Sequence, residues 1–513
     1  MWRLRRGFWN WLVVRKFRAN RPQAIPVPGV GRAPTIRTIP LRDRYPGIPI
    51  VKILVADHVP ADENRKARLL FIRVQTVLYR VFPPSRPGLR QISPDPAQAM
   101  ASAYGRGPRR VLPAPVLPAE YQGEIDLGHL AVAGPYSSYL RAVPGPDGGT
   151  DPSPSPSYEW DFSHLSRYEH HRDLRSLGVR VRFEIDDDRR GVSPVEIDCE
   201  LGVVTPDDAT WADARRLALC AATNHLSLVR HFTWVHLATA AQSAVATRNS
   251  LPPGHRLRRL LWPHVWGTQY SNELVMEVML MKGGDFESVF SFTHEGMCRL
   301  LEDSYELYDV STFDPYADVE QRGLVGAPFD LPSFENRRAH FDVMHAHARR
   351  YLHGCYRSDE EIRADADVVA WVADLNRRLP GGVDRVVGEA LTVDGVARLV
   401  AILLHVGTVE HEVMGSGLWN YQVWTHVQPV RVRKNGGRDP LDVYQRLVNF
   451  NFVLNVRRAP LLQDLSYLAV DEAGAAAFRT FRADLDELQA TVAKEDPACW
   501  RMSPAILEVS VNG

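Results

Sequence analysis

Two histidines five residues apart, His231 and His236, stand inside a long apolar stretch with helical periodicity. On a regular α-helix, five residues turn through about 500°, so the two rings would diverge by about 140°. Both rings can face one point only if the helix widens locally into a π-bulge, a feature that is frequent at functional sites. The pair alone is a weak signal, because most such pairs are structural, but it limits how this helix can fold.

A third histidine, His411, lies in the segment LLHVGTVEHEVMGSGLWNY. This segment is apolar on several faces, so we expect its helix to be buried. A buried imidazole without a partner costs roughly 1–3 kcal/mol, and either a metal ion or a backbone carbonyl could serve as that partner. The neighbouring Glu410 and Glu412 lie about 100° to either side of His411 on a helix, so we expect them to point elsewhere.

The composition of the chain changes near residue 155. Residues 1–155 are rich in proline and irregular in pattern, with one helical candidate over residues 62–82. The stretch 143–157 cannot sustain a helix or a central strand, and we interpret it as a linker or an exposed loop. We therefore expect an irregular N-terminal region over residues 1–155 and a folded domain over residues 156–513.

The second region begins with strand patterns and continues with helical ones. Residues 179–186 alternate at period two, and residues 195–204 form a second candidate strand. Thr205 or Asp207 is then placed to cap a long helix, and helical periodicity dominates to the end of the chain. The sequence therefore predicts a mainly α fold, with a small β-sheet at the start of a large helical domain.

Charge and cysteine content exclude several classes of protein. Lys plus Arg and Asp plus Glu each number 61, so the formal net charge is zero and bulk charge gives no support to nucleic-acid binding. The five cysteines are odd in number and form no CxxC pair, which fits a reducing, cytoplasmic setting rather than a disulfide framework. No stretch approaches eighteen consecutive apolar residues, so we expect no transmembrane helix.

The first 22 residues carry seven Arg or Lys, three Trp and no acidic residue. No small-residue cleavage site follows the apolar run at residues 8–14, which argues against a secretory signal. Two interpretations stay open. The segment could contact an anionic membrane surface, or it could be an ordinary N-terminal helix that docks on the body of the protein.

Other histidines have simpler interpretations. We expect the histidine-rich helix with His340, His345, His347 and His353 to present a solvated face rather than a metal site. No GxGxxG or GxxxxGK[ST] loop is present, so nucleotide binding has no support. No GxSxG nucleophile elbow is present either.

The helix with the histidine pair resembles the iron-helix signature of the lipoxygenase family. That signature continues through an Arg, a His, a Leu-Leu-x-Pro-His, a Thr and an Asn. With one residue inserted just before His255, the matching positions here are Arg248, His255, Leu260 to His264, Thr268 and Asn272.

Three further segments resemble the same family. Residues 205–219 resemble its approach to the iron helix, residues 314–324 a loop with Asp318 and Arg322-Gly323 in place, and residues 356–376 a helix pair before the second iron helix. His411 follows His236 by 175 residues, close to the usual interval in the family. The resemblance extends over roughly residues 155–513.

The resemblance implies one non-haem iron per chain, held by three histidines, a weak Asn-type side chain and the terminal carboxylate. The corresponding residues here are His231, His236 and His411, with the carboxylate of Gly513. Imidazoles and a carboxylate oxygen suit iron with open positions. The implied activity is dioxygenation of a polyunsaturated fatty acid or a related unsaturated molecule. Hydrogen is abstracted between two double bonds and O2 then adds, while the protein orients the chain.

Several positions depart from the family pattern. Gly415 stands four residues after His411, where the family usually has Asn, so that ligand position would be vacant. The chain ends in Gly513 rather than isoleucine. Ser227 and Leu418 replace glutamines that support the iron ligands, and such supporting groups orient ligands and tune the metal. Val275 replaces a small residue that steers oxygen in the family and is expected to narrow the substrate pocket.

These departures leave two alternatives open beside ordinary dioxygenation. One is a lipoxygenase-fold protein with altered oxygenase chemistry or with a binding role only. The other is a hydrolase that holds zinc on the same three histidines, because zinc commonly takes three protein ligands and a water. Residues 1–150 do not resemble the lipid-binding β-sandwich that precedes the helical domain in the family.

Overall fold

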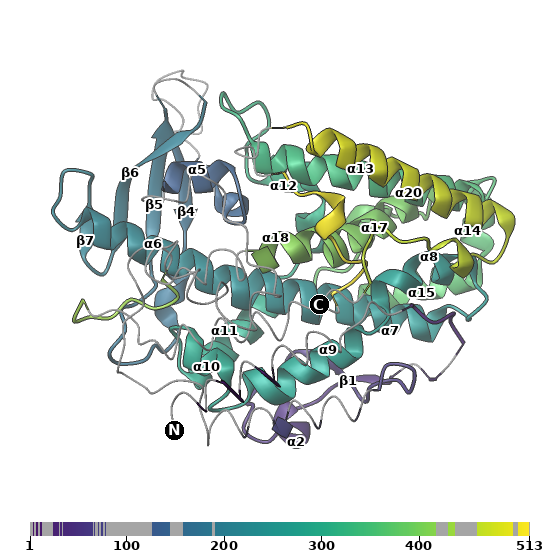
Figure 1. Cartoon of the computed structure of the whole chain (residues 1–513), viewed down its shortest axis with the longest axis horizontal. Helices are drawn as coiled ribbons and strands as arrows, with labels where there is room; N and C mark the ends of the chain where they lie inside the picture. The colour runs from purple at the N-terminus through teal and green to yellow at the C-terminus, as the bar shows by residue number, and fades with distance from the viewer. Residues whose placement is uncertain are drawn as a thin grey trace.

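The computed structural model describes two central helices, the helices that cover them and a small sheet at one end (Figure 1). The described residues are 24–29, 31–32, 34–64, 126–143, 157–186, 190–416, 429–436, 459–495 and 501–511, together with scattered positions in 1–12 and 66–77. Most of residues 1–22 and 62–82 therefore lie outside the description, although Lys66, Leu70, Arg73, Val74 and Val77 are helical.

Most of the described chain is helical, which confirms the predicted fold class. The α-helices are α2 (Leu41–Arg44), α5 (Leu127–Val132), α6 (Trp211–His225), α7 (Ala241–Ser250), α8 (Arg256–Val265), α9 (Thr268–Val275), α10 (Asp285–Val289), α11 (His294–Glu306), α12 (Pro315–Gln321), α13 (Pro332–His353), α14 (Asp359–Ala364), α15 (Ala366–Arg378), α16 (Asp384–Val387), α17 (Val393–His405), α18 (His411–Ser416) and α20 (Glu472–Val492). Three π-helical segments interrupt them: η5 (Leu226–Ala240), η6 (Met276–Leu280) and η8 (Val406–Glu410). The 3₁₀ segments are η3 (Ser137–Tyr139), η4 (Ser163–Arg167), η7 (Val310–Phe313), η10 (Ser466–Leu468) and η12 (Pro504–Ile506).

A five-stranded antiparallel sheet lies at the start of the helical region, in the order β3 (Arg141–Val143), β4 (Ser157–Asp161), β5 (Arg180–Ile185), β6 (Val192–Cys199) and β7 (Gly202–Val204). Its register pairs Trp160 with Val181 and Val181 with Ile197, all buried on one face. Strand β3 precedes residue 155 and pairs with β4 after it, so the sheet joins residues from both compositional regions. A separate pair, β1 (Ile36–Thr38) and β2 (Leu54–Ala56), is also antiparallel.

Two local predictions in this region were wrong. The candidate strand at 195–204 is a hairpin, because Gly202 has a φ of +98° and turns the chain between β6 and β7. The capping prediction fails because Asp208 Oδ2 accepts hydrogen bonds from Thr205 N and Oγ1, which closes a turn. Helix α6 consequently begins later, at Trp211.

The two central helices carry the candidate site residues. Helices α6, η5 and α7 form one continuous helix over residues 211–250, which crosses the middle of the molecule in Figure 1. Helices α17, η8 and α18 form the second, over residues 393–416. Helix α13 packs along α17, and α20 packs on α13. Among the described helices, none combines the length and apolar character that crossing a bilayer requires.

The histidine-rich helix α13 is a layer of this packing rather than a solvated face, so that prediction was wrong for two of its histidines. His340 is buried and its Nδ1 lies 2.8 Å from Asn336 O. His347 is buried and stacks on Phe481 of α20, with ring centroids 4.2 Å apart. His353 is exposed, as expected, and pairs with Asp394.

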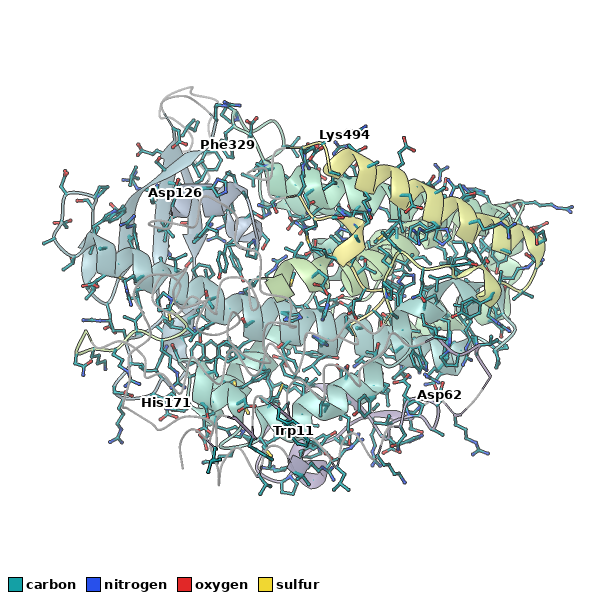
Figure 2. All side chains as sticks on the ribbon, in the orientation of Figure 1. Trp11, Asp62, Asp126, His171, Phe329 and Lys494 are labelled. Carbon is teal, nitrogen blue, oxygen red and sulfur yellow. The ribbon has the colours of Figure 1, made fainter. Side chains whose placement is uncertain are left out.

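A buried ion cluster fastens the N-terminal segment to the helical body. Arg248 on α7 donates to Glu63 at 2.6 Å and to Asp62 at 3.0 Å, and these side chains are almost completely buried. Asp62 is labelled in Figure 2. Glu63 also accepts from the backbone N–H of Gln269 at 3.0 Å, near the start of α9. The carboxylate of Glu63 therefore links residues 61–64 to both α7 and the start of α9.

We predict that Glu63→Ala lowers the free energy of unfolding by about 3 kcal/mol, because it leaves Arg248 with only one acidic partner in a buried setting. Urea denaturation measures this loss. Glu306→Ala is the matched control, because Glu306 pairs with Lys52 on the surface and such pairs contribute little. Equal losses in both variants would contradict the account.

Candidate metal centre

The local widening predicted for the His231–His236 helix is present as η5. The backbone N–H of Ala241 bonds to the carbonyl of His236, five residues earlier. Hydroxyl groups bond in the same five-residue pattern: Thr233 Oγ1 donates to Leu228 O, at 2.8 Å. In this geometry residues five apart return to nearly the same face of the helix, whereas an α-helix would separate them.

The second central helix widens immediately before His411. Segment η8 ends there, and the N–H of His411 bonds to the carbonyl of Val406, five residues earlier. Thr408 Oγ1 donates to Leu404 O at 2.8 Å and so satisfies a carbonyl near the widened turn. Widened turns therefore occur on both helices at the positions where they present histidines to each other.

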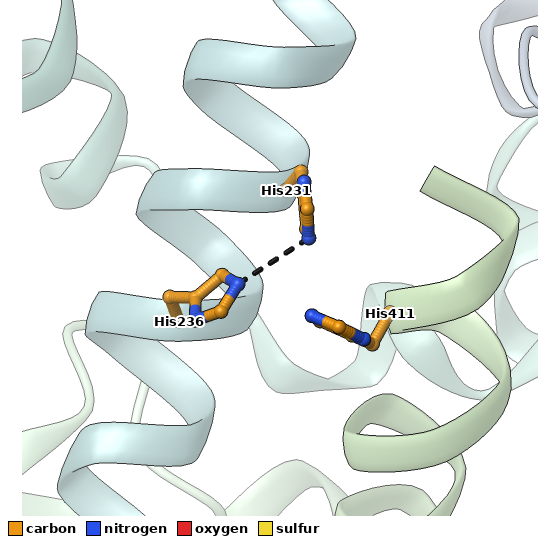
Figure 3. A group of neighbouring side chains, drawn as sticks. All are labelled: His231, His236 and His411. Atoms are coloured by element: carbon orange, nitrogen blue, oxygen red, sulfur yellow. Dashed lines mark hydrogen bonds between the residues drawn. The ribbon is translucent and has the colours of Figure 1, made fainter. Parts of the chain in front are cut away.

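The three rings converge on one point between the helices (Figure 3). One ligand nitrogen from each of His231, His236 and His411 lies within 4.8 Å of the others. The ring centroids are 4.9, 4.9 and 5.0 Å apart, and the Nε2 atoms of His231 and His236 are 3.3 Å apart. The sequence prediction that these residues share one site is consistent with this geometry.

The electrostatics of the cluster favour metal ligation. Burial holds the pKa values of His231 and His236 well below their usual range, and the neighbouring histidines lower them further. These imidazoles are therefore neutral at neutral pH and offer lone pairs. Two nitrogens bound to one metal at about 2.1 Å and near a right angle would lie about 3 Å apart, close to the distance between the two Nε2 atoms. The residues present thus fit a shared metal ion.

Asn272 supports His236 from the neighbouring helix α9. Its Nδ2 donates to the backbone carbonyl of His236 at 3.1 Å, and its side chain partly opposes the lowering of the pKa of His236. Asn272 is also one of the positions that carried the sequence resemblance. Its contact links helix α9 to the ligand helix at the turn that carries the second histidine.

A buried ion network braces the second ligand helix. Arg337 on α13 donates through Nε to Glu410, the residue before His411, and through Nη1 to Asp318 at 2.9 Å. Arg322 donates to the same Asp318 at 2.8 Å through Nη2. As predicted, Glu410 points away from the ring of His411, toward Arg337. The same prediction was wrong for Glu412, because its Oε1 lies 3.7 Å from Nδ1 of His411. Sequence reasoning missed Arg337, because nothing in a single sequence pairs it with Glu410.

The positions that depart from the family pattern have distinct placements. Gly415 is buried on α18, one turn after His411, and presents no side chain there. Val275 is buried at the end of α9, and Ser227 is buried on η5. Leu418 and Gly513 lie outside the described residues.

The described part of the C-terminal tail enters the interior beside η8. Val509 N donates to Ala459 O at 2.9 Å, and Val509 O lies 2.6 Å from His264 Nδ1. A Cβ on Gly407 of η8 would lie 4.0 Å from Ser510 Cα, so the tail passes against the backbone of this π-helix. Val511 is buried. The tail therefore reaches the helix that carries His411.

A second group with metal-ligating residue types, His255 with Asp365 and Asp367, is explained by helix capping. His255 Nδ1 accepts from Leu257 N at 3.2 Å, which leaves Nε2 to donate to Asp365 at 3.1 Å. Asp365 in turn accepts from Asp367 N at 3.1 Å at the start of α15. These bonds give the histidine and Asp365 structural partners.

The sequence of the chain is similar to those of several lipoxygenases. No protein-family model matches the chain. The chain is 28% identical over 195 residues to a mouse polyunsaturated fatty acid (12S)/(13S)-lipoxygenase of epidermal type, which covers 37% of this chain and 29% of the relative. It is 21% identical over 238 residues to a manganese lipoxygenase of Pleurotus sapidus, covering 45% and 36%. A linoleate 9/13-lipoxygenase of Pseudomonas aeruginosa is 27% identical over 214 residues, covering 38% and 30%.

Solved structures extend the likeness to nearly the whole chain. A calcium-dependent 11R-lipoxygenase superposes with a TM-score of 0.73 at 16% identity, over 98% of this chain and 80% of that one. A coral 8R-lipoxygenase gives a TM-score of 0.70 at 15% identity, with the same coverage. The fold is therefore that of the lipoxygenases. The sequence matches confirm the resemblance, and the chain is a divergent relative of that family. The sequence matches span about a third of the length of these relatives.

We predict that Arg337→Met weakens metal binding by roughly 10–100-fold, because supporting groups of this kind orient the ligands. It should also destabilise the fold by about 3–5 kcal/mol, because Glu410 then loses its buried partner. Metal titration and urea denaturation measure the two effects. Arg338→Met is the control: Arg338 lies next in sequence but pairs with Glu335 at the surface. Retention of full metal affinity in Arg337→Met would refute the bracing role.

Proposed function

We propose that this chain is a lipoxygenase-type dioxygenase that holds one non-haem iron on His231, His236 and His411. The convergence of three histidine nitrogens within 4.8 Å, two of them from buried residues and one from half-buried His231, carries the proposal. Neutral imidazoles from two helices satisfy a divalent ion while leaving positions open for other ligands. The sequence relatives support iron-type oxygenase chemistry, and one relative is named for manganese, so the identity of the metal is part of the test.

The proposed substrate is a polyunsaturated fatty acid or a related unsaturated molecule. Relatives are named for linoleate and polyunsaturated fatty acids, and one structural neighbour holds arachidonate. A metal held by the three histidines would supply the one-electron oxidation that removal of a hydrogen atom from the methylene between two double bonds requires. Addition of O2 to the resulting carbon radical, and return of the hydrogen atom, would give a hydroperoxide, so that substrate and O2 together account for every atom of the product.

The residues of the chain would contribute position and exclusion of water. His231 and His236 are held on one face by η5, so their ring nitrogens are oriented before a ligand binds. Gly415, one turn after His411, offers no ligand side chain, and we propose that a water molecule completes the coordination there. We propose that the carboxylate of Gly513 is a further ligand, because the tail before it runs against η8. Val275, and with it Ser227 and Leu418, would shape the substrate pocket.

Contact with a membrane through residues 1–22 belongs to the same proposal. The seven basic residues and three tryptophans of this segment suit an anionic lipid surface, and a cytoplasmic protein of this kind would meet its lipid substrate there. Of these residues, Leu4 and Trp11 are helical and exposed.

A second candidate function is a lipoxygenase fold with altered or lost catalysis. Gly415 favours it, because a vacant ligand position changes the electronic setting of the metal. Altered oxygenase chemistry would differ from ordinary dioxygenation in turnover while keeping the metal. A binding role alone would not need stoichiometric iron, so the metal content separates these two forms of the second candidate.

We expect purified protein to contain about one iron per chain, and His411→Ala to lose it, because a single remaining pair of imidazoles holds the ion much less strongly. Mass spectrometry of the metals in native protein measures the content. His353→Ala is the control, since His353 is exposed and pairs with Asp394 rather than with the histidine cluster. Stoichiometric zinc, or no metal at all, would sink the iron proposal.

We expect the iron-loaded protein to consume O2 with linoleate and to form conjugated dienes, and Val275→Ala to shift the position or chirality of the hydroperoxide. The physical reason is that removing a branched side chain opens space beside the substrate. Oxygen electrodes and chiral chromatography measure the two outcomes. Val235→Ala, in the core of η5, controls for general loosening. If iron-loaded protein leaves all unsaturated acids untouched, the second candidate function replaces the first.

A further inference from the structure

A cavity of about 330 Å³ lies between α2, the helical stretch around residues 73–77, and η6. Its apolar walls are Pro46, Val77, Val278 and Met281. Its volume falls at the lower end of the range for small-molecule sites, about 300–1,000 Å³. The charged groups in its wall are paired: Arg73 Nε donates to Glu277 Oε2 at 2.9 Å. A ligand in this space would therefore meet a mainly apolar surface.

A second cavity, of only about 20 Å³, lies beside the first. We call the first the outer cavity and the second the inner cavity. The two share Arg44 and Tyr45, and the inner one is also lined by Leu237 and Ala241 of the central helix and by Asn272. Because Leu237 follows His236 and Asn272 contacts the carbonyl of His236, the inner cavity borders the helix that carries this histidine.

A polar partition separates the two cavities. Arg44 Nη2 donates to Glu273 Oε2 at 2.6 Å, and Tyr45 OH donates to the same oxygen at 2.5 Å. Burial raises the pKa of Glu273, while the hydrogen bond from Tyr45 and the charge of Arg44 lower it. The partition joins the end of α2 to α9.

The outer rim of the cavity exposes a stripe of apolar side chains. Leu70, Val74 and Val77 are 62%, 48% and 60% exposed and follow the spacing i, i+4, i+7, which places them on one helix face. Val77 also lines the cavity, and Arg73 holds this stretch to η6 through Glu277. An exposed apolar stripe of this kind indicates a binding surface rather than ordinary solvent contact.

The charge of this stretch indicates which partner it meets. Residues 65–80 contain five Arg or Lys and no Asp or Glu, although the whole chain is neutral. Basic residues beside an apolar stripe are typical of helices that lie in the interface of an anionic membrane. Each such residue near the surface contributes about 1 kcal/mol of attraction to anionic lipid.

We propose that the face formed by Leu70, Val74 and Val77 docks on an anionic lipid bilayer, and that the outer cavity takes up one acyl chain from it. The docking stands independently of the metal centre. The uptake rests on the proposed function, because it identifies the acyl chain as the substrate.

Sedimentation with vesicles of phosphatidylcholine, with and without phosphatidylglycerol, tests the docking. The full chain is expected to bind only the anionic vesicles, and Val74→Glu is expected to reduce binding about tenfold by losing apolar burial and adding like charge. Val369→Glu is the matched control, since Val369 on α15 is 41% exposed and lies outside the stripe. Equal vesicle binding by Val74→Glu and by the unmodified chain overturns the docking. The docking is also overturned if analytical ultracentrifugation shows a dimer of the unmodified chain that Val74→Glu disrupts.

Nitroxide-labelled stearate tests the uptake, because a saturated chain binds without reacting. The spin label is expected to be immobilised when the full chain is mixed with labelled vesicles. Met281→Trp, which fills the cavity wall, should abolish immobilisation while vesicle binding and melting temperature stay unchanged. Immobilisation that survives in Met281→Trp overturns the uptake. Immobilised label together with no oxygenation of linoleate sustains this proposal and rejects the proposed function instead.

Discussion

The structure depends on one constraint, the widening of two central helices at the positions where they carry histidines. A regular α-helix would send the rings of His231 and His236 to different sides. In η5 the N–H of Ala241 reaches back five residues, and both rings turn toward His411. One nitrogen from each ring then lies within 4.8 Å of the others. A shared cation is the partner that three neutral imidazoles can bind together, which is why the metal centre is the central claim.

Contacts from the surrounding structure stabilise the widened turns of the two central helices. Threonine hydroxyls bond to carbonyls at both widened turns, as Thr233 and Thr408 do. Asn272 holds the carbonyl of His236 from α9, and Arg337 holds Glu410 from α13. Both ligand helices are thereby fixed by neighbours that do not touch the metal. The same helix α9 also lines the inner cavity.

The residues of the candidate site could be predicted from the sequence better than the packing of the helices could. The five-residue spacing of His231 and His236 required a widened helix if both rings were to face one point. The family resemblance supplied the reason for them to do so, with His411 as the third partner. Other features depend on tertiary contacts that no single sequence displays. His347 reads as polar in α13, yet Phe481 of α20 covers it. Glu63 lies in an irregular region of the sequence, yet its side chain is buried, where it pairs with Arg248 on α7. The turn at Gly202 was missed because the residues on both sides have the same alternating pattern.

Anomalous diffraction from crystals of the native chain, recorded on both sides of the iron absorption edge, tests the central claim most directly. The account predicts a single strong anomalous peak between the rings of His231, His236 and His411, present above the edge and much weaker below it. A peak that lies elsewhere, for example beside His255 and Asp365, would contradict it. So would a site between the three rings that is filled by packed side chains.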